Sequence, residues 1–299
     1  MTLVRWGILL LLLMGPWMAV YAQNESKPTV LARFQEAAAL DVDPRGRLYV
    51  ADAGRDVVQI LDAEGTVHAT LGQSGTRAGE FDDPVDLDAT NGQTLLVADA
   101  GNGRIQRFSS EWQYLEALPV GSTFGGEWGQ RAFDDGRDGS TVQGQGRPLA
   151  VASSDGDETF VIDGRDGVVV KFDAQRRAER IIGSGMGGGG LQEPVALALD
   201  GARRLYVADA EQEAVLAYDL FGTFIERVAT PSLPGVRAVS VHRERLWIVC
   251  PDRVMIWDPE TESTTEHPIS LEAPLVDVAR QGDDLFLLTS KEMSRLPHR

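Results

Sequence analysis

The sequence predicts an all-β fold, a six-bladed β-propeller of four-stranded antiparallel blades. The first observation is a short stretch of β-branched and aromatic residues that runs into an acidic turn, Arg204 to Ala210 (RLYVADA), and that occurs in six related copies. The second is that the copies follow one another at intervals of about 40 to 47 residues, with one gap of about 64, and propeller blades repeat at such intervals. The other five copies are Arg47 to Ala53, Thr94 to Ala100, Thr159 to Gly164, Arg245 to Cys250 and Asp284 to Thr289.

Constant spacings give the order of strands inside each repeat. In three copies a proline lies 15 residues before the Asp that ends the repeated stretch. Apolar residues then alternate with small or acidic ones, which indicates the innermost strand. A turn, the repeated stretch, a second turn with Gly or Asn, a third strand and a fourth strand follow. The proline and Asp positions are Pro84 and Asp99, Pro148 and Asp163, and Pro194 and Asp209.

The sixth repeat supplies three strands, at 275–279, 285–289 and 293–296, and lacks its fourth. A three-stranded blade would leave an open edge in the ring. The alternating stretch 29–34 precedes the first inner strand just as the fourth strand of any blade precedes the next repeat. We therefore expect this N-terminal strand to add to the outer edge of the last blade and close the propeller.

The first 22 residues are expected to be a signal peptide. Arg5 precedes an apolar run from Trp6 to Val20, and Val20 to Ala22 offers small residues before a cleavage site. No Cys follows, which excludes lipid attachment there, so a secreted or periplasmic protein without a membrane span in its mature chain is predicted. An uncleaved anchor is the alternative. The expected organisation is a signal peptide over 1–22, a linker over 23–28 and a propeller over 29–299, with an insertion at about 121–147.

Charge and cysteine content exclude some functions. The formal net charge is −17, whereas nucleic-acid binders need a basic face, so DNA and RNA are not expected partners. The single cysteine, Cys250, permits no internal disulfide. With no histidine at a recurring offset from it, we expect a buried thiol rather than a nucleophile.

The stretch Val97 to Phe108 (VADAGNGRIQRF) and the connector Gly79 to Pro84 (GEFDDP) resemble the NHL repeat family. The resemblance extends over about residues 37–230, and the last two repeats keep the strand pattern but lose the Asp. It implies a propeller fold. The resemblance does not identify one function, because NHL propellers serve as sensor domains, RNA binders and protein-interaction platforms, and their relatives include lyases and lactonases.

We predict a non-catalytic binding module without a cofactor, which binds a protein or a glycan through one face. In a propeller the second turn of each blade and the connectors between blades emerge on the same side, and here that side also receives the insertion. Exposed aromatic residues serve as anchors at interfaces, although a loose connector is the alternative for this segment. The expected ligand-binding residues are Arg55, Asn102, Arg104 and Arg165 at the turns, and Phe124, Trp128 and Phe133 in the insertion.

The turn carboxylates Asp52, Asp99, Asp163 and Asp209 recur in four repeats. Catalytic groups rarely recur in every repeat, whereas a carboxylate beside free backbone N–H groups stabilises a turn. We therefore expect these residues to be structural.

The alternative function is a calcium-dependent lactonase or hydrolase. The resemblance implies it, because lactonase-type relatives hold Ca²⁺ in the central channel with Glu, Asn and Asp. Here the inner strands offer only carboxylates, and oxygen ligands of this kind suit Ca²⁺. The Glu and Asn of those enzymes are absent at the corresponding positions, so solvated channel carboxylates are the competing interpretation. The candidate ligands are Asp41, Asp86, Asp88 and Asp277.

Overall fold

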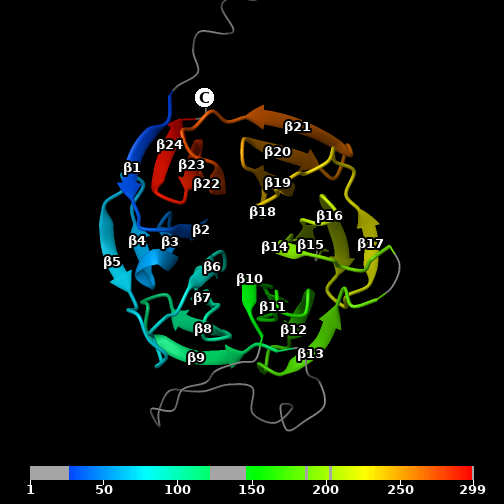
Figure 1. Ribbon diagram of the computed structural model, residues 1–299, viewed down its shortest axis with the longest axis horizontal. Coiled ribbons are helices and arrows are strands. Elements are labelled where there is room, and N and C mark those ends of the chain that lie inside the picture. The colour runs from blue at the N-terminus through cyan, green and yellow to red at the C-terminus, as the bar shows by residue number, and fades with distance from the viewer. Residues whose placement is uncertain (1–26, 122–145, 186–187, 202–203, 298–299) are drawn as a thin grey trace, which may run out of the picture.

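Six four-stranded antiparallel sheets form a closed ring in the computed structural model, which describes residues 27–121, 146–185, 188–201 and 204–297. Viewed down the short axis, the innermost strands surround the centre and the outermost strands form the perimeter (Figure 1). The predicted six-bladed all-β propeller is therefore confirmed. None of the described residues forms a helix long and apolar enough to cross a membrane.

Each of the first five blades is continuous in sequence and runs from the centre outward. Blade 1 contains β2 (Ala37–Val42), β3 (Leu48–Asp52), β4 (Val57–Leu61) and β5 (Val67–Leu71), with the short 3-10 helix η1 (Ala53–Arg55) between β3 and β4. Blades 2 and 3 contain β6 (Pro84–Asp88), β7 (Thr94–Asp99), β8 (Arg104–Ser109), β9 (Tyr114–Pro119), β10 (Pro148–Ser153), β11 (Thr159–Asp163), β12 (Val168–Phe172) and β13 (Ala178–Ile182). Blades 4 and 5 contain β14 (Pro194–Leu199), β15 (Arg204–Asp209), β16 (Ala214–Asp219), β17 (Phe224–Arg227), β18 (Ala238–His242), β19 (Arg245–Cys250), β20 (Arg253–Asp258) and β21 (Ser263–Pro268).

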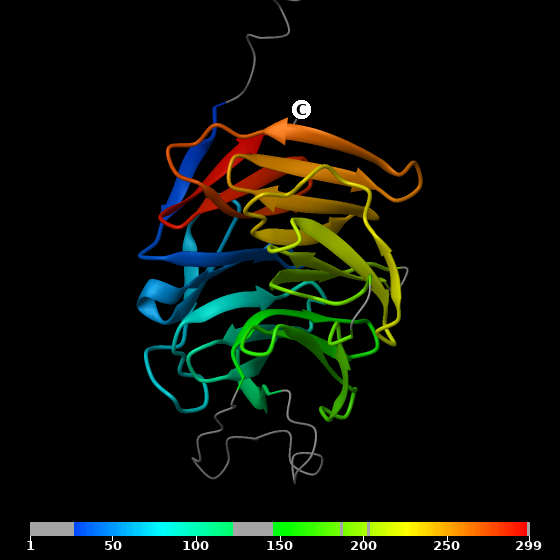
Figure 2. The same ribbon diagram turned by 45° about the vertical axis from the view of Figure 1, so that its right-hand side comes forward.

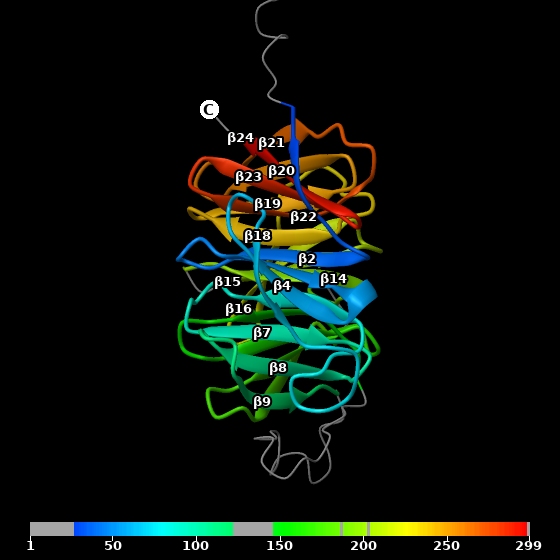
Figure 3. The same ribbon diagram turned by 90° about the vertical axis from the view of Figure 1, so that its left-hand side faces the viewer.

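Blade 6 joins the two ends of the described chain. It consists of β22 (Leu275–Gln281), β23 (Asp284–Thr289), β24 (Glu292–Pro297) and, at its outer edge, β1 (Thr29–Arg33). β1 pairs antiparallel with β24, with Val30 opposite Ser294 and Ala32 opposite Met293. β1 lies along the outside of β24 in two views at right angles (Figures 1 and 3). The expected closure by the N-terminal strand is confirmed.

The hydrophobic core lies between neighbouring blades rather than inside any one of them, and the oblique view shows the blades packed face to face around the axis (Figure 2). Six clusters of buried side chains each combine residues from two adjacent blades. The cluster between blades 6 and 1 includes Phe34, Leu48 and Phe286. Because a blade buries its apolar faces only against its neighbours, the ring is stable only when it closes.

A bulge begins five of the six inner strands. In blade 2, for example, Pro84 pairs with Asp99 and Asp86 pairs with Ala98, so Val85 has no partner of its own. A bulge re-aims a side chain, and the residues at this position line the mouth of the central cavity. They are Ala38, Val85, Leu149, Val195 and Val276, and Arg237 stands just before β18 at the corresponding place in blade 5.

Candidate functional site

The four turn carboxylates are fully buried and stabilise the face that carries the connectors, which we call the connector face. Each accepts hydrogen bonds from backbone N–H groups of the connector that leads into its own blade. The N–H of Glu36 donates to Asp52 Oδ1 at 2.8 Å, and the N–H of Gln192 donates to Asp209 Oδ2 at 2.6 Å. Asp99 and Asp163 accept in the same way. These bonds fix the connectors to the second turns, which confirms the structural role expected for these carboxylates.

Two of the predicted ligand-binding residues, Asn102 and Arg104, are buried, and that part of the prediction needs correction. They are 2% and 1% exposed. Arg104 Nε donates to Asp99 Oδ2 at 2.8 Å, and Asn102 Nδ2 donates to Asp99 Oδ2 at 2.9 Å. Gln106 Nε2 also donates to this oxygen, at 2.9 Å. Blade 2 thus neutralises its buried carboxylate with side chains that looked like rim residues in the sequence.

The structure describes two of the other five predicted binding residues, Arg55 and Arg165. The Arg55 side chain is 52% exposed and lies 3.6 Å from Asp52, and Arg165 is exposed in the second turn of blade 3. Both remain at the connector face. The three aromatic residues of the insertion, Phe124, Trp128 and Phe133, lie outside the described residues.

Three channel carboxylates form a relay of hydrogen bonds from blade to blade. Asp277 of blade 6 accepts the N–H of Leu40 in blade 1 at 2.8 Å. Asp41 of blade 1 accepts the N–H of Ala89 in blade 2 at 2.7 Å. Asp86 of blade 2 accepts the N–H of Val151 in blade 3 at 2.7 Å. These bonds satisfy backbone donors that face the neighbouring blade and have no partner within their own sheet.

Asp88 makes a second link between blades 2 and 3. Its Oδ2 accepts the backbone N–H of Ser153 at 2.6 Å and the Ser153 hydroxyl at 2.7 Å. Its Oδ1 accepts the N–H of Thr90. All four candidate calcium ligands therefore hold adjacent inner strands together on one side of the channel, formed by blades 6, 1, 2 and 3.

Burial in the channel raises the pKa of three of these carboxyl groups. Burial, and then the nearby charge of Asp88, hold the pKa of Asp41 well above its usual range. Burial acts in the same way on Asp86, with Asp277 as the nearest like charge. Burial raises the pKa of Asp277 to about 7 despite its two backbone hydrogen bonds. Desolvation disfavours the charged form, so this side of the channel holds carboxyl groups that lack a compensating cation.

The four candidate calcium ligands are not gathered into a single cluster in the described part of the chain. Among the described residues, no group of three or more His, Cys, Asp or Glu side chains is placed to hold a metal ion. The carboxylates come from successive blades and each is directed to the next blade by its hydrogen bond. The geometry of the described chain therefore does not favour the calcium-enzyme alternative.

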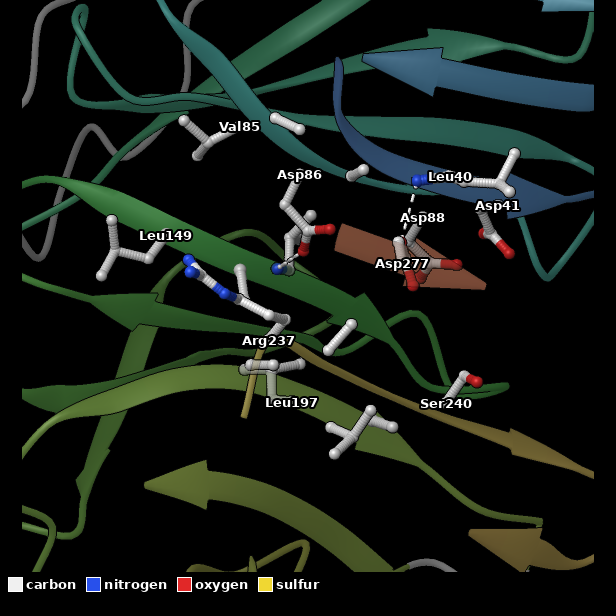
Figure 4. A pocket seen from close by; sticks show the side chains of 18 of the residues that line it. Leu40, Asp41, Val85, Asp86, Asp88, Leu149, Leu197, Arg237, Ser240 and Asp277 are labelled. Carbon is white, nitrogen blue, oxygen red and sulfur yellow. Dashed lines mark hydrogen bonds between the residues drawn. The ribbon is translucent and has the colours of Figure 1, made fainter. Parts of the chain in front are cut away.

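The inner strands enclose a central cavity of about 630 Å³, lined by all six blades. This is within the range of ordinary ligand sites, roughly 300 to 1,000 Å³. The carboxylates occupy one side, and Ala196, Leu197 and Val239 of blades 4 and 5 make the opposite wall mainly apolar. Figure 4 shows Asp41, Asp86, Asp88 and Asp277 on the strands above Leu197 and Arg237.

Blade 5 departs from this pattern, and sequence reasoning missed it. Arg237 occupies the mouth position that holds an aliphatic residue in the other five blades. Its side chain extends among the inner strands in Figure 4 and forms no hydrogen bond or ion pair with the part of the chain that the structure describes. Ser240 lies three residues after Arg237, on β18, and lines the same cavity. Its hydroxyl is buried without a partner among the described residues. The loss of the repeat pattern in blade 5 was the sequence signal for this site.

His242, at the far end of β18, contributes an uncharged ring to the cavity wall. Burial, together with the positive charge of Arg280, lowers the pKa of His242 to about 4. Its ring packs edge-on against Trp247 with centroids 5.6 Å apart. At neutral pH, Arg237 is consequently the one cation among the described side chains that line the cavity.

No protein-family model matches the chain, and no curated protein matches it in sequence. Solved structures do. A streptogramin B lyase is 10% identical, with a TM-score of 0.60, and the match covers 90% of this chain and 96% of that one. A virginiamycin B lyase from Staphylococcus aureus is 9% identical, with a TM-score of 0.61 over 90% and 97% of the two chains. U3-55K is 15% identical, with a TM-score of 0.61 over 90% and 98%. At these identities the likeness extends to the fold alone.

Proposed function

We propose that this protein is an exported NHL-type propeller that works as a non-catalytic binding module and engages a protein or glycan partner through its connector face. The observation that carries the proposal is the composition of that face. An aliphatic ring from the bulged positions surrounds the cavity mouth, and Arg237 interrupts it. Arg55 and Arg165 lie farther out on the second turns.

This arrangement has the anatomy of a binding surface. Interfaces combine an apolar centre with a polar rim, and arginine is enriched among the residues that contribute most to affinity. In a chain with a formal net charge of −17, exposed arginines around an apolar ring favour a partner that offers acidic groups. The connectors are held to the second turns by the buried turn carboxylates, as where the Arg147 N–H donates to Asp163 Oδ1 at 2.9 Å. A face fixed in this way loses little conformational entropy on binding.

The channel carboxylates support binding rather than catalysis. Asp41, Asp86 and Asp277 each accept a backbone N–H of the next blade, so their positions serve the ring. Because these hydrogen bonds explain the positions of the carboxylates without a reaction at the cavity, they support the binding function.

The test compares charge reversals on opposite faces. Purified protein is immobilised and exposed to a glycan array and to the secreted and envelope proteins of the producing cells. Arg165→Glu changes the connector face, and Arg45→Glu makes the same change at an exposed turn between β2 and β3, on the opposite face. We expect specific capture that Arg165→Glu weakens at least tenfold and Arg45→Glu leaves unchanged. Equal loss in both variants, or no capture at all, would contradict the proposal.

Export is tested separately. The protein should appear in the periplasmic or extracellular fraction with residues 1–22 removed, and N-terminal sequencing should begin near Gln23. A full-length protein in the membrane fraction would identify the N-terminal segment as an anchor instead.

A further inference from the structure

The central cavity carries opposite charges that do not pair with each other. Asp86 and Asp277 line one side, and Arg237 stands at the mouth. Each carboxylate accepts backbone N–H groups but contacts no Lys or Arg side chain among the described residues. The guanidinium of Arg237 likewise has no partner in the described chain. Buried carboxylates are normally paired with a cation, so Asp86 and Asp277 can accept one, and the exposed guanidinium of Arg237 is available to an anion.

We propose that the cavity binds a small zwitterion, an α-amino acid or a short peptide, whose carboxylate pairs with Arg237 and whose ammonium group lies against Asp86 and Asp277. This site goes beyond the proposed function, because it lies inside the ring and takes a small molecule rather than a macromolecular partner.

Each end of such a ligand has a suitable receptor. The guanidinium is a fork of N–H donors that matches a carboxylate in two parallel hydrogen bonds. Each oxygen of a carboxylate has two lone pairs, and the backbone N–H groups of Leu40 and Val278 occupy one on each oxygen of Asp277. An ammonium group, with three donors, can use those that remain. Burial raises the pKa of Asp86 and Asp277, and a bound ammonium group would favour the ionised carboxylates and lower both pKa values.

The remaining residues of the cavity lining determine which ligand side chain can bind. Ala196 and Leu197 of blade 4 make the wall opposite the carboxylates apolar, which favours an aliphatic side chain over a charged one. Ser240 lines the cavity, and its hydroxyl, which has no partner among the described residues, can donate to a ligand carbonyl or carboxylate. A volume of about 630 Å³ accommodates a single amino acid or a dipeptide.

Calorimetric titration with matched ligands tests the proposal. The probes are leucine and leucyl-leucine, which separate the free amino acid from the short peptide. Leucine methyl ester lacks the carboxylate, and 4-methylpentanoate lacks the ammonium group. We expect leucine, the dipeptide or both to bind, and the corresponding single-charge analogue to bind about 10- to 100-fold more weakly, since a hydrogen bond to a charged group is lost.

Two variants assign the ends of the ligand. In Arg237→Gln, the zwitterion should bind no better than the methyl ester, because the carboxylate has lost its partner. In Asp277→Asn, the preference for the zwitterion over 4-methylpentanoate should fall about tenfold or more. Arg237 is exposed and unpaired in the described chain, so its replacement should leave the melting temperature unchanged. Arg45→Gln removes an exposed arginine from the opposite face and is the matched control, which should bind leucine as the parent protein does.

Several outcomes would overturn the proposal. The first is that neither leucine nor leucyl-leucine binds at about 10 mM. The second is that leucine and either single-charge analogue bind with equal affinity. The third is that Arg237→Gln leaves the affinity for leucine unchanged. Partner capture at the connector face is measured on a different ligand class with Arg165→Glu, so the proposed function can stand when the zwitterion site fails, and the reverse also holds.

Discussion

Replacing Phe34 with alanine should weaken the closure of the propeller. Phe34 follows β1 directly, is 6% exposed and packs in the cluster that joins blades 6 and 1. Its backbone N–H also donates to the Lys291 carbonyl at 2.8 Å, beside β24. Truncation of a buried Phe to Ala costs about 3 to 5 kcal/mol, from lost transfer free energy and the cavity left behind. For a domain of this size that corresponds to a fall in melting temperature of roughly 6 to 20 °C.

The assay combines thermal unfolding with hydrogen exchange. Val30→Ala is the matched control, because Val30 lies in the same strand but is 42% exposed, and an exposed truncation changes stability by only about 0.5 kcal/mol. If Phe34 holds the seam, amides of β24 should exchange faster in Phe34→Ala while those of β11, on the far side of the ring, stay protected. A variant that melts within about 1 °C of the parent, with unchanged exchange in β24, would refute the closure argument.

Three further predictions address the buried charges. Arg104→Ala should destabilise the protein by about 3 to 5 kcal/mol in urea unfolding, because it leaves Asp99 buried without its ion pair. Arg55→Ala should cost less than about 1 kcal/mol, because the Arg55 side chain is 52% exposed and its contact with Asp52 is long, at 3.6 Å. Similar small effects in both variants would show that Arg104 is not structural. Since the folded pKa of Asp277 is raised to about 7, its contribution to stability is fully present below the unfolded value of about 4 and is lost as pH rises through 7. Asp277→Asn should therefore show a shallower fall in the free energy of unfolding between pH 4 and 7, and an unchanged slope would count against the raised pKa. Addition of millimolar Ca²⁺ should leave the melting temperature within about one degree, because a ligand that does not bind the native state cannot shift it; a rise of several degrees that Asp86→Ala abolishes would restore the calcium-enzyme alternative.

The sequence by itself determined the strand order, the number of blades and the N-terminal closure. These features follow from local chemistry: alternation marks strands, and Gly, Asn and Asp mark turns at fixed spacings. Because the repeat occurs six times, the same local inference can be made in each of the six copies. The structural role of the turn carboxylates was also predictable, because Asp52 and its counterparts recur in one position beside free backbone donors.

Only the tertiary structure decided which polar residues line the central cavity and which are buried under the connectors. Asn102 and Arg104 occupy turn positions that look exposed in sequence, but the connector folds over them and they neutralise Asp99. The backbone donor to Asp86, on Val151, lies 65 residues away in the next blade. Arg237 lines the same cavity as the carboxylates only because six strands from distant parts of the chain converge on one axis. The blade-to-blade contacts of a ring bring together residues far apart in the chain, and no local pattern encodes which of them will share a cavity.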